Sequence, residues 1–269
     1  MYQKTIEQFA ELAAAKAQAL RRNPLGFLIA SAMAGAYVGV GILLIFSVGQ
    51  AIDPSVRSLV MGASFGIALT LVVFAGSELF TGHTMFMAFG MLRGTISARD
   101  LQSSWALTWI GNLFGSALLA GIFYLGGGGQ ILKEGADLIF KVADYKMNSP
   151  ALALVARGIL CNWLVCLALW TSARATSDSA KCILIFWCLF AFIACGFEHS
   201  VANMTIFSVA LLGNHPPQVS LVGMLHNLAW VTLGNAIAGV LFMAGAYRWA
   251  SEPLSAWAKS APRVPAPAE

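Results

Sequence analysis

The chain has 269 residues, of which 58% are hydrophobic and only 10% are charged. Soluble domains carry about 25% charged residues, so this composition excludes an ordinary soluble protein and predicts an all-α membrane protein. The formal net charge of +4 comes without a dense basic cluster, which argues against nucleic acid as a partner.

Residues 1–22 predict an amphipathic helix at the cytoplasmic surface. Six charged residues are interspersed there with small apolar ones. The segment lacks the long apolar core of a cleavable signal peptide. The helix could lie on the membrane surface or pack on a neighbouring subunit.

Residues 23–250 predict one channel domain with six membrane spans. A span needs about 20 apolar residues, and six segments meet this requirement. They are Leu25–Gly49, Ser58–Leu92, Leu101–Leu125, Pro150–Thr171, Lys181–Leu212 and Val219–Trp249. The second and fifth are too long for one simple helix. The Pro- and Ala-rich residues 251–269 predict a disordered cytoplasmic tail.

The basic residues predict the orientation of these spans. With the N-terminus inside, the cytoplasmic loops and termini hold eleven Lys and Arg, against four in the outer loops. Positive charge concentrates on the cytoplasmic side of membrane proteins, so both termini are expected in the cytoplasm.

The two long spans each contain an interruption with a glycine and a glutamate. Residues 76–85 read GSELFTGHTM and residues 196–204 read GFEHSVANM. Glu78 and Glu198 are the only charged residues between 58 and 92 and between 182 and 247. A carboxylate at bilayer depth usually faces a cavity or a partner, and paired broken helices are typical of transporters and channels.

The halves, about residues 25–125 and 150–249, resemble each other beyond these breaks. Residues 108–121, TWIGNLFGSALLAG, align with residues 231–245, VTLGNAIAGVLFMAG. Three spans followed by three predict an inverted 3+3 repeat. The alternative is that membrane helices share glycines by chance.

The breaks predict an anion site without a buried Lys or Arg. Half-helices starting near Thr84 and Ala202 would aim their positive N-terminal ends at the membrane midplane. His199 could donate a hydrogen bond or a proton to an anion, or be a neutral structural histidine. Thr81 offers a hydroxyl from the other break.

The other polar residues near the breaks suggest supporting roles. Glu78 and Glu198 are expected to accept hydrogen bonds from the amides of the broken helices, or to be protonated. The asparagines are expected to brace the loops; they are Asn112, Asn162, Asn203 and Asn235. His83 is either a group at the pore mouth or a structural one. Arg157 is expected to point outward or to meet another subunit.

Other function classes find less support. The Gly62–Gly66 segment matches Gly-x-Ser-x-Gly, but it lies inside an apolar helix rather than at a strand-to-helix turn. No His-Glu-x-x-His is present. The sequence therefore predicts neither an enzyme nor a metal site nor a cofactor. A pore for water or another uncharged solute is the second hypothesis, although the chain has no Asn-Pro-Ala pair.

These motifs resemble the formate/nitrite transporter family, from about residue 23 to residue 247. The resemblance is carried by residues 31–39 (SAMAGAYVG), the two breaks, residues 160–168 (LCNWLVCLA) and residues 231–235 (VTLGN). It implies an aquaporin-like protomer in the bacterial inner membrane, assembled as a homopentamer with one pore in each protomer.

The resemblance also implies roles for individual residues. His199 and Thr81 match the residues that flank the pore midpoint, with Glu198, Asn162 and Asn203 beside them. Lys146 and Asn235 match residues of the outer vestibule. Two apolar slits close the pore; they are formed by Leu69, Leu79 and Phe80 on the cytoplasmic side and by Phe65 and Phe192 on the other.

The expected function is passage of a small monovalent anion, nitrite first, through the lipid bilayer. Transient protonation by His199 would let the anion cross as a neutral acid, with a proton as co-substrate. A rival is plain anion conduction in which His199 only donates a hydrogen bond. The sequence Thr81–Thr84 (TGHT) favours nitrite over formate without excluding a formate channel.

Overall fold

The computed structural model describes residues 2–251, and these form an all-helical bundle. Of the predicted tail at 251–269, Ser251 ends the last helix and the rest lies outside the described residues. The helices are α1 Gln3–Arg22, α2 Pro24–Gln50, α3 Pro54–Ser64, α4 Ile67–Ala75, α5 Phe80–Arg93, α6 Ala98–Leu125, α7 Leu138–Met147, α8 Ala151–Arg174, α9 Asp178–Ala194, α10 Ser200–Leu212, α11 Leu221–Ile237, the π-helix η1 Ala238–Gly245 and α12 Ala246–Ser251.

Five helical segments of the described chain are long and apolar enough to cross a membrane. They are Pro24–Gln50, Pro54–Ala75, Ala98–Leu125, Ala151–Arg174 and Leu221–Ser251. Each matches a predicted span, or the first part of one. The predicted fifth span is divided between α9 and the short apolar helix α10. Both predicted interruptions are therefore present, between α4 and α5 and between α9 and α10.

The N-terminal helix α1 packs on its own chain. Its apolar side carries Ile6, Phe9 and Ala13, all buried. The Phe9 ring stacks on the rings of Phe86 and Phe89 in α5, with centroids 5.1 and 6.0 Å apart. The two sequence-based alternatives for this helix, the membrane surface or a neighbouring subunit, miss this contact. The amphipathic pattern predicts that one side of this helix is buried, but it does not identify α5 as the helix that covers it.

Close helix pairs hold the bundle together. α2 lies along α6, where a Cβ atom added to Gly115 would sit 1.8 Å from the Ala32 carbonyl oxygen. In the second half, α8 lies along α11, and a Cβ on Gly234 would sit 2.3 Å from the Val155 carbonyl oxygen. Small residues allow this approach, because packing rather than the hydrophobic effect drives helix association in lipid.

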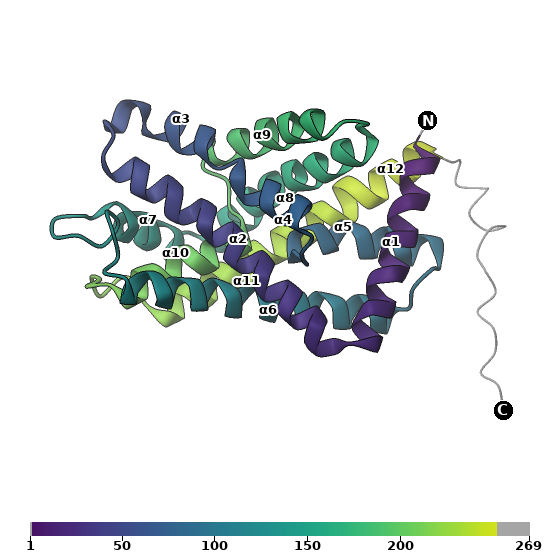
Figure 1. The fold of residues 1–269 in the computed structure, drawn as a ribbon, viewed down its shortest axis with the longest axis horizontal. Helices are drawn as coiled ribbons and strands as arrows, with labels where there is room; N and C mark the ends of the chain where they lie inside the picture. Colours follow the sequence, from purple (N-terminus) through teal and green to yellow (C-terminus); the bar gives the residue numbers. More distant parts are fainter. Residues whose placement is uncertain (1, 252–269) are drawn as a thin grey trace.

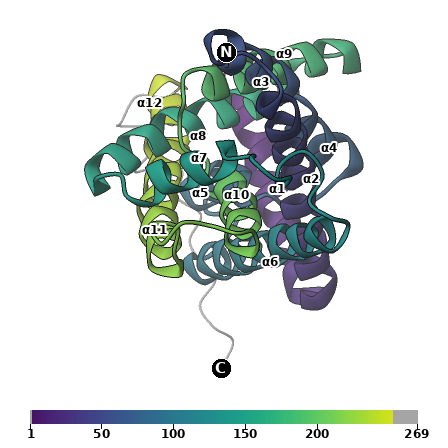
Figure 2. The same cartoon turned by 90° about the vertical axis from the view of Figure 1, so that its left-hand side faces the viewer.

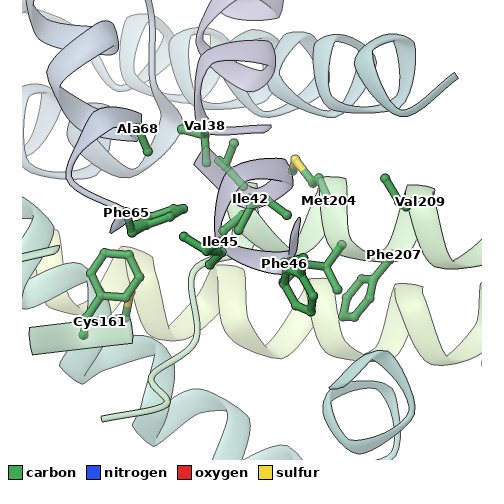
Figure 3. Packing of buried hydrophobic residues seen from close by; sticks show 14 of the residues in the cluster. Val38, Ile42, Ile45, Phe46, Phe65, Ala68, Cys161, Met204, Phe207 and Val209 are labelled. Carbon is green, nitrogen blue, oxygen red and sulfur yellow. The ribbon is translucent and has the colours of Figure 1, made fainter. Parts of the chain in front are cut away.

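The apolar core lies where α2 faces α10. Figure 3 shows Ile42 of α2 beside Met204 of α10, and Phe46 of α2 beside Phe207 of α10. All four side chains are buried. This contact ties the first half of the chain to the second half-helix.

The two ends of the bundle carry different helices. α1 and α12 lie together at one end, and α7 lies at the opposite end (Figure 1). Figure 2, viewed from the α7 end, shows α7 crossing in front of the ends of the long helices. The Tyr2 and Tyr247 rings, 5.1 Å apart, join the first and last described helices. Both ends of the described chain are thus on one side.

We expect Gly115→Ala to destabilise the protein and Gly121→Ala to leave it stable. The added methyl group at Gly115 meets backbone of α2, and such overpacking costs about 1–3 kcal/mol. At Gly121, also in α6, nothing lies within 4 Å of the added Cβ, and alanine favours a helix by up to about 1 kcal/mol. Thermal unfolding in detergent measures both; equal midpoints for the two variants would contradict the assigned contact.

Candidate permeation site

The first break is shaped by a glycine and capped by an asparagine. Gly76 has φ +73°, a left-handed conformation that favours glycine. The chain then turns inward, and the Glu78 amide donates to the Ala30 carbonyl of α2 at 3.2 Å. α5 begins at Phe80, whose amide donates to Oδ1 of Asn112 at 2.9 Å. The Asn112 side chain donates in turn to the Glu78 carbonyl at 2.9 Å.

The second break repeats these contacts residue for residue. Gly196 has φ +70°. The Glu198 amide donates to the Arg157 carbonyl at 3.2 Å, and the Ser200 amide donates to Oδ1 of Asn235 at 3.0 Å. Asn235 also donates to the Glu198 carbonyl at 3.1 Å. Lipid offers no hydrogen-bond partner to a free amide. The first amide of each half-helix is therefore satisfied by an asparagine side chain from an unbroken helix, Asn112 of α6 or Asn235 of α11.

This arrangement corrects the sequence-based interpretation of the glutamates. The half-helices begin at Phe80 and Ser200, a few residues before the predicted starts. Asparagines accept the hydrogen bonds from their first amides, so the carboxylates are left for other partners. Glu78 Oε2 pairs with Lys16 Nζ at 2.5 Å, and Glu198 Oε2 pairs with Lys146 Nζ at 2.8 Å.

The two half-helices meet at Thr81 and His199. The Thr81 Oγ1 atom lies 3.2 Å from Nε2 of His199, and both side chains are buried. The other ring nitrogen, Nδ1, accepts from the Ala202 amide at 3.1 Å and so caps α10. Because Nδ1 is an acceptor, the proton of the neutral ring is on Nε2. The ring also stacks on Phe192, with centroids 5.9 Å apart.

Asn162 and Asn203 each make hydrogen bonds to residues of the breaks. The Asn162 side chain donates to Oγ1 of Thr84 at 2.9 Å and to the Asn235 carbonyl at 2.6 Å. Asn203 donates to Oε2 of Glu198 at 2.6 Å and to Oδ1 of Asn227 at 2.8 Å. These bonds connect the two breaks through α8 and α11.

A cavity of about 350 Å³ opens on the α7 side of the breaks; we call it the α7 cavity. Its charged lining residues are Arg57, Lys146 and Glu198, and His199 lies at its inner end. Glu198 is close to two cations, since Lys146 lies 2.8 Å from its Oε2 atom and Arg157 lies 3.6 Å from its Oε1 atom. Positive charge thus exceeds negative charge around this cavity.

A second cavity, of about 450 Å³, opens on the opposite side beside α1; we call it the α1 cavity. Lys16 of α1 and Glu78 of the first break line it, together with His83. His83 is fully buried, and its Nε2 atom lies 2.6 Å from Oε2 of Glu78. This cavity ends at Leu69 and Leu79.

A void of about 10 Å³ lies between the two cavities. It shares Leu69 and Leu79 with the α1 cavity, and Phe192 and His199 with the α7 cavity. Phe65 also lines it, edge-on to Phe192 at 5.5 Å. A space of this size holds about one water molecule, so this conformation is closed between the cavities.

Two residues lie apart from where the resemblance implied. Phe80 is absent from the linings of these three cavities, and its ring packs edge-on against Trp105 at 6.2 Å. Asn235 is fully buried behind the second break, where it caps α10, and it does not line the α7 cavity. Motif position gave the right segment for both residues, the start of α5 and the middle of the sixth predicted span, but not the direction of the side chain.

Sequence reasoning missed the contacts of Lys16 and Arg157 with the glutamates of the two breaks. Lys16 was assigned only to the amphipathic helix, although it reaches the first break as Lys146 reaches the second. Arg157 reaches toward the α7 end, where its guanidinium donates to Tyr145 and Ser149, and it also lies 3.6 Å from Oε1 of Glu198. A search for a cation to neutralise each buried carboxylate could have suggested both residues.

The chain matches the family model described as formate/nitrite transporter over residues 3–249. The chain belongs to the formate/nitrite transporter family. This agrees with the resemblance inferred from the motifs, and it fits a multi-pass membrane protein.

Curated relatives support the same assignment. The chain is 53% identical to the nitrite transporter NirC of Escherichia coli (strain K12) over 251 residues, 93% of each protein. It is also 53% identical to NirC of Salmonella typhimurium, covering 95% of this chain and 94% of the relative. The formate channel BtFdhC of Bacillus thuringiensis is 34% identical, with 90% and 93% covered. These relatives are transporters and channels, not enzymes.

Solved structures share the fold. A structure described as an FNT family ion channel matches with a TM-score of 0.91 and 52% identity, covering 93% of this chain and all of that one. A pentameric formate channel with formate bound matches with a TM-score of 0.72 and 29% identity, covering 86% of this chain and 98% of that one.

We expect Asn112→Ala and Asn235→Ala to lower the stability of the protein by similar amounts. Each leaves a buried helix amide without an acceptor, which costs about 1–3 kcal/mol. The exposed Asn214→Ala is the matched control. Thermal unfolding in detergent measures the effect, and midpoints equal to that of the control would show that these side chains do not hold the breaks.

Proposed function

We propose that this protein is a membrane channel that passes nitrite between the α7 cavity and the α1 cavity. The observation that carries the proposal is the contact between Thr81 Oγ1 and His199 Nε2 at the closed point between two open cavities. His199 lines the void between the cavities and the Thr81 hydroxyl lies beside its Nε2 atom, so an anion passing this point would meet the N–H donor with the hydroxyl next to it. The identity to NirC transporters supports nitrite as the substrate.

The charges around the α7 cavity would raise the local concentration of anions. Lys146 and Arg57 line this cavity and Glu198 neutralises only part of their charge. An excess of one sign in a cleft attracts ions of the other sign. An anion would then reach Phe192 and His199 at the inner end of the cavity.

The apolar residues on either side would oppose a bare ion. Phe65 and Phe192 form one slit, and Leu69 and Leu79 form the other. Moving a charge out of water costs several kcal/mol, so the anion needs donors in place of its hydration shell. The Nε2–H of His199, the Thr81 hydroxyl and the positive ends of α5 and α10 would supply them.

The geometry favours His199 as a hydrogen-bond donor over His199 as an acid. Its Nδ1 atom is already the acceptor of the α10 cap. A second proton on Nδ1 would break that cap and put a positive charge at the positive end of a helix. In this scheme His199 stays neutral and donates through Nε2, and any proton that accompanies the anion is bound elsewhere.

The membrane arrangement follows from the same observations. We propose six crossings, with α9 and α10 together forming the fifth, and two halves related as an inverted repeat. The matched contacts of Asn112 and Asn235 support the repeat. Both ends of the described chain lie on one side, and the bias of Lys and Arg supports a cytoplasmic location for that side.

The assembly is proposed to be a homopentamer in the bacterial inner membrane, with one pore in each protomer. The similarity to a pentameric formate channel supports it. The protomer also exposes large apolar side chains on its long helices, among them Phe114, Ile122 and Trp187, which lipid or neighbouring subunits can cover.

The same fold is compatible with two alternative functions. A formate-preferring channel is suggested by the relative BtFdhC and by the formate channel structure. A pore for uncharged solutes would use the same cavities without need of donors at the midpoint. The buried donor pair and the surplus of cations around the α7 cavity favour an anion.

We expect His199→Asn to reduce nitrite flux by about tenfold or more, because a hydrogen bond to a charged group contributes about 1.5–3 kcal/mol. Asparagine keeps the cap of α10, since it is a preferred N-cap residue, but it does not reach Thr81. His215→Asn, in the loop after α10, is the matched control. Flux into proteoliposomes measures the effect; equal flux in His199→Asn and the control would remove His199 from the mechanism.

We expect nitrite flux through the native protein to be inhibited by formate and by other small monovalent anions, in proportion to how well each passes. Competition in the same proteoliposomes ranks them and identifies a formate-preferring channel. Stopped-flow swelling with glycerol tests the uncharged-solute alternative. Swelling faster than in empty liposomes, together with no anion flux, would contradict an anion channel.

A further inference from the structure

His83 is a buried histidine at the inner end of the α1 cavity, and the scheme above gives it no role. Its Nε2 atom lies 2.6 Å from Oε2 of Glu78, and its Nδ1 atom lies 2.7 Å from Oγ of Ser104. Glu78 also binds Lys16 of α1. In Figure 1, α1 runs across the end of the bundle where α5 ends. The histidine thus joins a carboxylate that lines the cavity to a hydroxyl group behind it.

The second break has an asparagine at the equivalent place. Asn203 follows Glu198 by five positions, as His83 follows Glu78. Its side chain donates to Oε2 of Glu198 at 2.6 Å, the distance found between His83 and Glu78. Asparagine does not titrate. The two breaks therefore share one framework, and at this position only the break beside the α1 cavity has a titratable side chain.

The partners of His83 can accommodate a second proton on its ring. In the neutral ring Nε2–H donates to the Glu78 carboxylate and Nδ1 accepts from the Ser104 hydroxyl. When Nδ1 is protonated it can donate to the same oxygen, with the hydroxyl turned to the preceding turn of α6. His199 has no such freedom, because a backbone amide already occupies its Nδ1.

The charges around the two cavities differ in the same way. Around the α7 cavity, Arg57, Lys146 and the adjacent Arg157 outnumber Glu198. The charged residues that line the α1 cavity are Lys16 and Glu78, which balance each other. A proton on His83 gives the α1 cavity a positive surplus as well.

The surroundings of His83 act in both directions on its charge. Burial of the ring and the cation of Lys16 on α1 oppose a positive ring, and Glu78 favours it. Two uncharged residues also contact His83. The ring of Phe27 in α2 lies edge-on to the histidine ring, and the Trp105 indole of α6 donates to the His83 backbone carbonyl. One turn before Ser104, Asp100 is engaged with Arg21 at 2.6 Å. On the side of α8, Leu169 packs on Gly82, and the Cys166 thiol donates to the Thr81 carbonyl.

We infer that the α1 cavity is a second binding site for a small monovalent anion, and that protonation of His83 switches it on. The inference rests on the proposed anion channel. The α7 cavity carries its positive surplus permanently, whereas the α1 cavity acquires one only when His83 takes up a proton from water on its own side.

The proton step is a simple exchange. A hydronium ion in the α1 cavity gives one proton to the Glu78–His83 pair and becomes water. The ring ends with an N–H bond on both nitrogens, Nε2–H donating to Glu78 and Nδ1–H donating to Ser104. The anion enters beside Lys16, and loss of the proton to water reverses the change.

The first test is nitrite flux in proteoliposomes of uniform orientation, with the pH on each side varied separately. We expect flux to rise by at least about threefold when the pH on the α1 side falls from about 7.5 to 5.5, a modest value for charge in a cleft. His83→Asn, which places the residue of the other break at this position, should lose this rise, so that its flux is the same at about pH 7.5 and 5.5 on the α1 side. His215→Asn should keep it.

The second test does not depend on transport, and its main measurement uses the native protein. Solid-state NMR of the native protein with ¹⁵N-labelled histidine distinguishes neutral from protonated rings. We expect the ring assigned to His83 to become doubly protonated over this pH range while that of His199 stays neutral. Ser104→Ala, which removes the acceptor of Nδ1–H, should shift the His83 titration to lower pH.

The outcomes separate this inference from the proposed function. A pH response retained in full by His83→Asn, or a His83 ring that stays neutral down to pH 5.5, overturns the inference and leaves the anion channel standing. No nitrite flux in the native protein at any pH refutes the channel itself. Titration of His83 together with loss of the pH response in His83→Asn supports the switch.

Discussion

A helix that stops inside a membrane leaves amide groups that lipid cannot satisfy, and the way this chain satisfies them decides the rest of the structure. Asn112 on α6 and Asn235 on α11 each accept the first amide of a half-helix and donate to the carbonyl of the glutamate before it. These bonds fix where α5 and α10 begin. Thr81 and His199 lie within one or two residues of those starts, so the asparagines also set the distance between the two donors at the centre.

The glutamates are freed for a different task because the asparagines cap the helices. Each carboxylate is paired with a lysine from an element outside the break, Lys16 of α1 or Lys146 of α7. An unpaired carboxylate at this depth would be strongly unfavourable. The pairing therefore holds α1 and α7 over opposite ends of the bundle, and each helix brings a cation to the mouth of a cavity. The same pairs therefore stabilise the breaks and fix where the charges of the two cavities lie.

The two breaks are alike in framework and different in charge. Glu78 with His83 corresponds to Glu198 with Asn203, and Leu79 corresponds to His199. The histidine of the second break caps a helix and lines the void between the cavities, so in the proposed channel it serves as a fixed donor. The histidine of the first break lies between a carboxylate and a hydroxyl, so it can hold a proton. One channel can in this way keep a neutral donor at its narrowest point and a titratable group at one mouth.

The sequence by itself determined the membrane class, the place of both breaks and the residues that meet there, because hydropathy, glycines and isolated glutamates are local signals. Similarity within the family added the slit residues Leu69, Leu79, Phe65 and Phe192. Only the tertiary structure decided which polar groups pair: Lys16 lies 62 positions from Glu78, and Asn112 lies 32 positions from Phe80. It also turned Phe80 toward Trp105 and Arg157 toward Glu198. Such partners are selected when helices pack, since burial makes every polar group require one, and no pattern along the chain states which helix will supply it.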